Sequence, residues 1–170
     1  MQETPPESLR IDLDAPPYVP KYYTKLVEHR PGGQFDFDPS KLALYVSERQ
    51  PERPTGPYAP SPFLPRDLAE EIQRQPVLNA NLLDWFLLPG NDCFIPEAWM
   101  KIIDQGGYIC FWGTTYLDEY GKPSLRALHF NTCYGLDSYD VPLDYENEFY
   151  AWYPAAVWAD ASSSPKPAKP

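Results

Sequence analysis

The hydrophobic pattern of this chain changes its period at Gly106-Gly107, and that change constrains the fold more than any other feature. Before the double glycine, apolar residues recur at helical spacing in three segments, 67–75, 79–87 and 96–105. After it come two runs rich in β-branched and aromatic residues, 108–117 and 124–133, which flank a turn at 118–121. The sequence therefore predicts helices first and an antiparallel hairpin second.

A third strand is expected at 145–153, where side chains alternate between two faces. The predicted fold class is α+β, with short helices packed on one face of a small antiparallel β-meander and with proline-rich extended segments. Pairing Leu117 with Lys122 or with Ser124 gives the same two faces, because the two registers differ by an even step. The face predicted to lie on the helices carries Ile109, Phe111, Leu117, Leu128 and Phe130, and the other carries Tyr108, Cys110, Trp112, Thr114, Tyr116, Ala127, His129, Asn131 and Cys133.

Twenty-two prolines divide the chain into segments. Residues 1–34 are predicted to form an extended proline-rich arm, in which Leu9, Ile11 and Leu13 alternate as in one edge strand. A single α+β domain is expected over 35–160. Residues 161–170 combine proline and serine with little to bury, so a disordered tail is expected there.

Two further segments are predicted inside that domain. Residues 35–50 resemble a helix that Asp38 can cap, with Leu42, Leu44, Tyr45 and Val46 as its apolar face. Prolines 51, 54, 57 and 60 repeat with a period of three, which indicates a polyproline connector over 51–65. The connector could bind a proline-reading domain, or it could lie over the domain with Tyr58 and Phe63 as anchors.

The charge balance limits the partners. The chain has a net charge of −10, and its fourteen lysines and arginines are scattered, whereas phosphate binding needs them clustered. We expect no nucleic-acid partner, although a nucleic-acid mimic stays open. No stretch approaches the roughly 20 apolar residues of a membrane span, so no membrane partner is expected. Three cysteines and no visible export signal favour a soluble, cytoplasmic protein.

A catalytic site has one candidate pair, Cys110 and His129, which share a predicted sheet face. Reactive cysteines usually have basic neighbours, whereas Trp112 and Tyr108 flank this one. A small buried thiol beside a hydrogen-bonded histidine is the expected arrangement, so no catalytic residue is assigned. No metal-ligand spacing and no phosphate-binding glycine loop is present in the sequence, so no metal and no cofactor are expected.

The segment between Ala127 and Pro165 carries no lysine or arginine, but it has six carboxylates and nine aromatic residues. Rings and carboxylates together suit a basic protein, a sugar or a cation. We therefore predict a non-enzymatic protein-interaction module, adaptor or inhibitor-like, that binds a basic partner through an aromatic and acidic sheet face. Its expected binding residues are Trp112, Tyr116, His129, Tyr139, Asp140, Asp144, Glu146 and Trp152. Carbohydrate or small-ligand binding is the alternative, and a cysteine-dependent enzyme is a further one.

Four phrases of the sequence occur in a recognisable order: Pro-Val-Leu-Asn-Ala-Asn at 76–81, Ile-Pro-x-x-Trp at 95–99, Phe-Trp-Gly-Thr at 111–114 and Pro-Ala-Ala-Val at 154–157. In this order the chain resembles a group of small uncharacterised bacterial proteins with a leucine-rich helix, an Ile-Pro-x-x-Trp helix start and a Phe-Trp-Gly-Thr strand. The resemblance covers roughly residues 35–159. It implies no activity and no functional residue.

Overall fold

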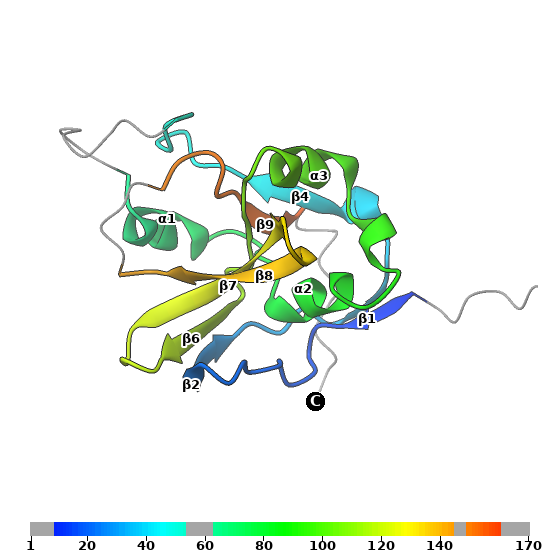
Figure 1. Cartoon of the computed structure of the whole chain (residues 1–170), viewed down its shortest axis with the longest axis horizontal. Coiled ribbons are helices and arrows are strands. Elements are labelled where there is room, and N and C mark those ends of the chain that lie inside the picture. The colour runs from blue at the N-terminus through cyan, green and yellow to red at the C-terminus, as the bar shows by residue number, and fades with distance from the viewer. Residues whose placement is uncertain (1–8, 54–62, 145–148, 161–170) are drawn as a thin grey trace, which may run out of the picture.

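Strand β7 (Pro123–Asn131) organises the sheet in this computed structural model, which describes residues 9–53, 63–144 and 149–160 (Figure 1). Within these ranges, the sheet path runs β2-β6-β7-β5-β9-β4, and β8 pairs with β7 off this path. Strands β1 and β3 form a separate two-stranded sheet. The elements are β1 (Arg10–Asp12), β2 (Tyr23–His29), β3 (Gln34–Asp36), η1 (Pro39–Lys41), β4 (Leu42–Tyr45), α1 (Pro65–Ile72), α2 (Ala80–Phe86), η2 (Asp92–Phe94), α3 (Glu97–Asp104), β5 (Ile109–Cys110), β6 (Thr114–Asp118), β7, β8 (Gly135–Pro142) and β9 (Ala155–Trp158).

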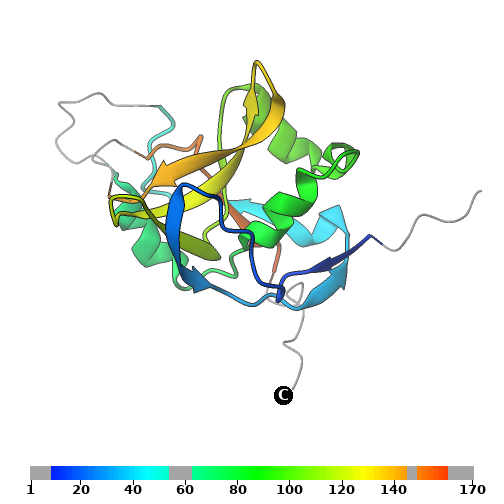
Figure 2. The same ribbon diagram turned by 60° about the horizontal axis from the view of Figure 1, so that its bottom comes forward.

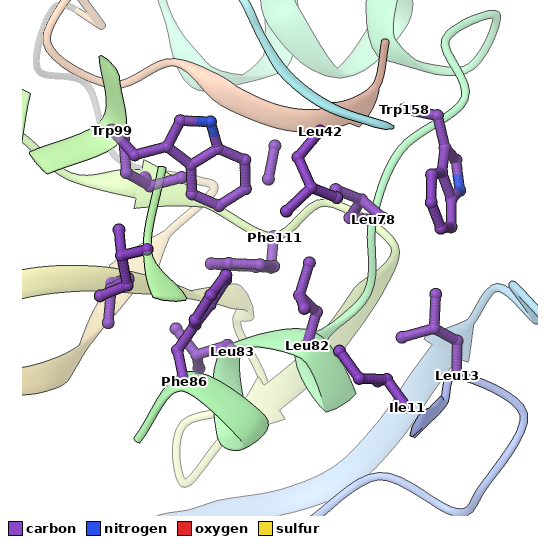
Figure 3. Packing of buried hydrophobic residues seen from close by; sticks show 14 of the residues in the cluster. Ile11, Leu13, Leu42, Leu78, Leu82, Leu83, Phe86, Trp99, Phe111 and Trp158 are labelled. Carbon is purple, nitrogen blue, oxygen red and sulfur yellow. The ribbon is translucent and has the colours of Figure 1, made fainter. Parts of the chain in front are cut away.

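The predicted α+β class is confirmed. Helices α2 and α3 lie in the segments 79–87 and 96–105, and α1 overlaps the segment 67–75 but begins at Pro65 and ends at Ile72. The distribution of the helices differs from the expectation. Helices α2 and α3 cover one face of the sheet, and Figure 3 shows Phe111 between Trp99 of α3 and Leu82 of α2. The opposite face is also apolar, and helix α1 packs Leu68 and Ile72 on it. Helices therefore cover both faces of the sheet. The second face is apolar, so it can bury the apolar side of α1.

The meander consists of β6, β7 and β8, and its third strand differs from the predicted one. Residues 149–153 form no strand, since the Tyr153 backbone N–H donates to the Tyr150 carbonyl oxygen at 2.9 Å and closes a turn, and residues 145–148 lie outside the described part of the chain. The third strand is β8, which pairs with β7 along its whole length from Gly135 to Pro142. A tight turn precedes it: the Asn131 side chain accepts a hydrogen bond from the Cys133 backbone N–H at 2.8 Å, and Gly135 has a φ of 81°. Such a turn ends the second strand before the predicted residue 133.

The register of the hairpin also differs from both predicted alternatives, because Leu117 pairs with Pro123. A turn at Trp112-Gly113 separates β5 from β6. Both strands pair with β7, but in different registers: Ile109 of β5 pairs with Leu128, and Leu117 of β6 pairs with Pro123. A side chain at Gly113 would lie 2.8 Å from the Leu78 carbonyl oxygen, so the close approach of two backbones requires glycine. Ile109, Phe111 and Leu128 are buried as predicted, but Phe130 is 52% exposed at the far end of β7.

The N-terminal arm packs against the α+β domain. Strand β2 pairs with β6, and Ile11 and Leu13 are buried in the main core cluster. Asn79, the N-cap of α2, donates through its side-chain amide to the carbonyl oxygens of Leu13 at 2.7 Å and Arg30 at 2.9 Å. Figure 2 shows the segment between β1 and β2 (darker blue) running along the same side of the molecule as α2. Asn79 of the Asn-Ala-Asn segment therefore joins the arm to α2 by hydrogen bonds.

The helix predicted for residues 35–50 is wrong. Asp38 does cap a turn by accepting from the Ser40 backbone N–H at 2.9 Å, but the turn is the short 3-10 helix η1. Residues Leu42–Tyr45 then form β4, which pairs with β9. The distant strand β9 offers backbone hydrogen bonds to these apolar residues, and this tertiary pairing overrides the helical spacing.

The remaining predicted segments are only partly described. Prolines 54, 57 and 60 of the connector, its anchor Tyr58 and the tail 161–170 lie outside the described residues. Phe63 is described, and it is 4% exposed within the cluster around α1, as expected for an anchor. None of the helices in the described ranges is long and apolar enough to cross a lipid bilayer.

Candidate functional site

A row of aromatic side chains lies on the α1 side of the sheet, and we name it the aromatic strip. It comprises Tyr108, His129, Tyr139, Phe149, Tyr150, Trp152 and Tyr153. The rings of His129, Tyr108, Tyr153 and Phe149 form a nearly parallel column, with successive centroids 5.3, 5.1 and 4.5 Å apart. The inner end of the column meets buried Trp112 edge to face at 6.3 Å.

The strand register explains why these rings meet. Cys110 on β5 pairs with Ala127 on β7. Tyr108, just before β5, and His129 on β7 are each two residues from this pair, so they lie on the same face. Ala127 also pairs with Tyr139 on β8, and the Tyr139 ring lies 4.8 Å from Tyr108 and 5.4 Å from His129. The outer members stay accessible, because Tyr139 is 44% exposed and Trp152 is 36% exposed.

Burial keeps His129, Tyr108 and Tyr153 of the strip uncharged near pH 7. Burial lowers the pKa of His129, and the neighbouring Asp137 opposes that shift. Burial also raises the pKa of Tyr108 and of Tyr153, so both phenols keep their protons. His129 is therefore an uncharged ring at neutral pH, and Asp137, its partner across β7 and β8, provides an adjacent negative charge.

A second group of polar side chains lies on the α2 side of the sheet, and we name it the Arg126 cluster: Tyr18, Tyr22, Asp84, Tyr116, Arg126 and Asp140. Arg126 is 3% exposed and forms an ion pair of 2.8 Å with Asp84 of α2. Its guanidinium lies 5.6 Å from the centre of the Tyr18 ring. The Tyr116 hydroxyl donates to the Tyr18 carbonyl oxygen at 3.2 Å.

Burial dominates the titration of this cluster. It raises the pKa of Asp84 against the opposing effect of Arg126, and it raises the pKa of Tyr116 to about 12. Asp140 stands directly across from Arg126 in the β7–β8 pairing. Burial raises the pKa of this carboxyl to about 6. The cluster therefore holds a buried cation with two carboxyls whose ionised forms burial disfavours.

The predicted binding residues do not share one surface. His129, Tyr139 and Trp152 belong to the aromatic strip, whereas Asp140 belongs to the Arg126 cluster because neighbouring residues on a strand point to opposite faces. Trp112 and Tyr116 were predicted as binding residues, but they are 3% and 0% exposed. Trp112 lies under α1, and Tyr116 lies under Tyr23 and α2. Asp144 forms a 2.9 Å ion pair with Lys122, and Glu146 lies outside the described residues.

The sequence analysis also missed residues in both groups. Tyr108 was placed on the correct face but left out of the binding set, although it contacts three other rings of the strip. Arg126 was not singled out. Its position inside the apolar run from Leu125 to Leu128 was the available signal, since a charged residue in a buried strand needs a partner.

The Cys110 thiol has the environment of a structural residue. It is fully buried, burial raises its pKa, and its Sγ atom contacts the Tyr108 carbonyl oxygen at 3.7 Å. The His129 ring stacks on Tyr108. His29 bridges Thr114 and the Leu13 carbonyl oxygen, at 2.9 and 3.1 Å. In the described part of the chain, no three His, Cys, Asp or Glu side chains are placed to hold a metal ion.

The chain matches no protein-family model, and searches of curated proteins and of solved structures find no match.

Proposed function

We propose that this domain is a non-enzymatic protein-interaction module, adaptor or inhibitor-like, that binds a partner with a basic surface through the aromatic strip. One observation carries the proposal: the exposed ring of Tyr139 contacts a stacked column that is anchored in the core through Phe149, and the exposed ring of Trp152 contacts Tyr150, which meets the same column. Exposed tyrosine and tryptophan on a rigid support are the residues that dominate binding energy at protein interfaces.

The support lowers the cost of binding. Tyr108 and Tyr153 stack within 7° of parallel, and Tyr153 also meets Tyr150 edge to face at 5.1 Å. Rings that already hold one another in place lose little freedom when a partner covers them. The strip therefore has the preorganisation expected of a binding surface.

The chemistry of the surroundings favours a basic partner. No lysine or arginine occurs between Ala127 and Pro165, and Asp137 lies beside the strip. A guanidinium or ammonium group of the partner can stack on a neutral aromatic face and pair with a carboxylate. The net charge of −10 would accelerate the encounter with such a surface and oppose binding to nucleic acid.

A cytoplasmic location is part of this proposal. Cys93 and Cys133 are exposed and unbridged, as expected of a protein in a reducing compartment. The strip itself does not depend on that location.

The test selects peptides from a random display library on the immobilised full chain. Wild type should enrich peptides rich in lysine and arginine, and their binding should weaken steeply as salt rises. The double variant Tyr139→Ser/Trp152→Ser should lose the enrichment. The matched control is Tyr120→Ser, because Tyr120 is 78% exposed at the β6–β7 turn, outside the strip.

Two results would contradict the proposal. One is equal enrichment by the double variant and by wild type, with both proteins folded by circular dichroism. The other is selection of acidic peptides, which would reverse the proposed charge complementarity.

A further inference from the structure

Buried polar atoms without a hydrogen-bond partner are concentrated at the Arg126 cluster. Among the described residues they are the Tyr23 hydroxyl, Ser124 Oγ, Arg126 Nε, Arg126 Nη1, Asp140 Oδ1 and Trp112 Nε1. Only Trp112 lies on the α1 side of the sheet. Folded proteins leave few such atoms unpaired, because each one has lost its contact with water without a replacement. Their concentration in one region indicates that a hydrogen-bonding ligand binds there.

The five remaining atoms come from residues that are neighbours. Ser124 pairs with Tyr116 across β6 and β7, and the Tyr23 ring stacks on Tyr116 at 4.4 Å and 3°. Asp140 pairs with Arg126 across β7 and β8. Ser124 and Arg126 are two residues apart on β7 and therefore share a face. The guanidinium donors, the carboxylate acceptor and the two hydroxyls thus come from neighbouring residues in one region of the sheet.

The charges around this region select the ligand class. Arg126 already forms an ion pair with Asp84, and Asp140 is its neighbour across β7 and β8. An anionic ligand would meet both carboxyls, and a cationic ligand would meet the guanidinium. A neutral molecule avoids both costs. Because the unpartnered set holds donors and an acceptor, the ligand needs groups that both donate and accept, and hydroxyls do both.

The cover of this region is aromatic and partly exposed. Tyr18 and Tyr22 are 59% and 47% exposed, and they belong to the segment 16–22, which contains Pro16, Pro17 and Pro20. Prolines have no N–H to donate, so this segment can form few backbone hydrogen bonds. Its link to the sheet includes the bond from the Tyr116 hydroxyl to the Tyr18 carbonyl oxygen. Tyrosine rings in such a cover can stack on the apolar face of a sugar ring.

We propose that the Arg126 cluster is a second binding site, which holds one neutral sugar ring beside Arg126 and Asp140 and beneath Tyr18 and Tyr22. The guanidinium donates to one ligand hydroxyl through Nε or Nη1, and Asp140 Oδ1 accepts from another. The segment 16–22 lifts to admit the ligand and closes over it. This site is separate from the aromatic strip, which lies on the other face of the sheet.

The test titrates the full chain with D-glucose, D-galactose and D-mannose, and follows the Nε–H signals of arginine in ¹⁵N-labelled protein by NMR. At least one of these sugars should shift the Arg126 signal saturably, with the assignment made from Arg126→Lys. The charged probes D-glucuronate and D-glucosamine should bind more weakly than the neutral sugar. Loss of a hydrogen bond to a charged group predicts binding about tenfold weaker in Asp140→Ala.

Two further variants complete the design. Tyr18→Ala should weaken sugar binding, and it should leave the fold intact because that ring is mostly exposed. Tyr120→Ala, at an exposed ring outside the cluster, should bind like wild type.

Three outcomes would overturn the proposal. The first is an absence of saturable shifts with all three neutral sugars. The second is equal binding by wild type and by folded Asp140→Ala and Tyr18→Ala. The third is a high-resolution crystal structure grown with the best sugar that shows only ordered water on Arg126 Nε and Nη1.

Discussion

Replacement of Asn79 by alanine tests whether the Asn-Ala-Asn phrase holds the arm to the domain. Asn79 is 1% exposed, and its side-chain oxygen accepts from the Asn81 backbone N–H at 3.1 Å at the start of α2. Its amide donates to the carbonyl oxygens of Leu13 and Arg30. Alanine removes the cap and both donors at a site where water has little access.

The expected loss follows from these contacts. Removal of an N-cap costs about 1 kcal/mol. The Arg30 carbonyl loses a buried donor, which costs roughly 1–3 kcal/mol. The Leu13 carbonyl keeps the His29 ring nitrogen at 3.1 Å, so its loss is smaller. We therefore expect Asn79→Ala to lower the free energy of unfolding by about 2–4 kcal/mol.

Urea unfolding followed by tryptophan fluorescence measures this loss, and two variants divide it. Asn79→Ser keeps an oxygen that can cap α2 but cannot reach the arm, so it should recover only about 1 kcal/mol. Asn81→Ala removes donors to Asp12 and Ala15 at a more accessible position, and it should cost less than Asn79→Ala. A loss below 1 kcal/mol in Asn79→Ala would refute the reasoning.

Three further predictions concern the core, the backbone turn and the pH response. Phe111→Ala should lower the free energy of unfolding by about 3–5 kcal/mol, and a loss below 1 kcal/mol in urea would contradict its place in the core. Gly113→Ala should cost about 1–3 kcal/mol, because the new Cβ would lie 2.8 Å from the Leu78 carbonyl oxygen; an unchanged melting temperature would disprove this close approach. Burial raises the pKa of Asp140 from 3.8 to about 6, so the folded state binds more protons than the unfolded state between these values. Asp140 should therefore lower the free energy of unfolding of wild type as pH rises from about 4 to about 6. The expected decrease is on the order of 1 kcal/mol after allowance for the half-exposed position of this carboxyl. Asp140→Asn should lack this decrease when urea unfolding is measured across the same pH range.

Part of the candidate site followed from the sequence, and part did not. Strand alternation placed His129 on the same face as Tyr108, and the aromatic segment after Ala127 contains Tyr139 and Trp152. The same alternation separates Asp140 from Tyr139, but β8 was not predicted, so its two faces could not be assigned. Arg126 became a candidate only when the fold brought Asp84 of α2 within 2.8 Å of it.

The sequence by itself determined the α+β class and the local elements: the approximate positions of α1, α2 and α3 and the turn between β6 and β7. These depend on spacing and on residues a few positions apart. Only the tertiary structure decided that residues 42–45 form a strand, that β8 completes the meander and that α1 covers the second face. Each of these requires a partner far along the chain. A strand is stabilised by its neighbours in the sheet, so its own residues specify it incompletely.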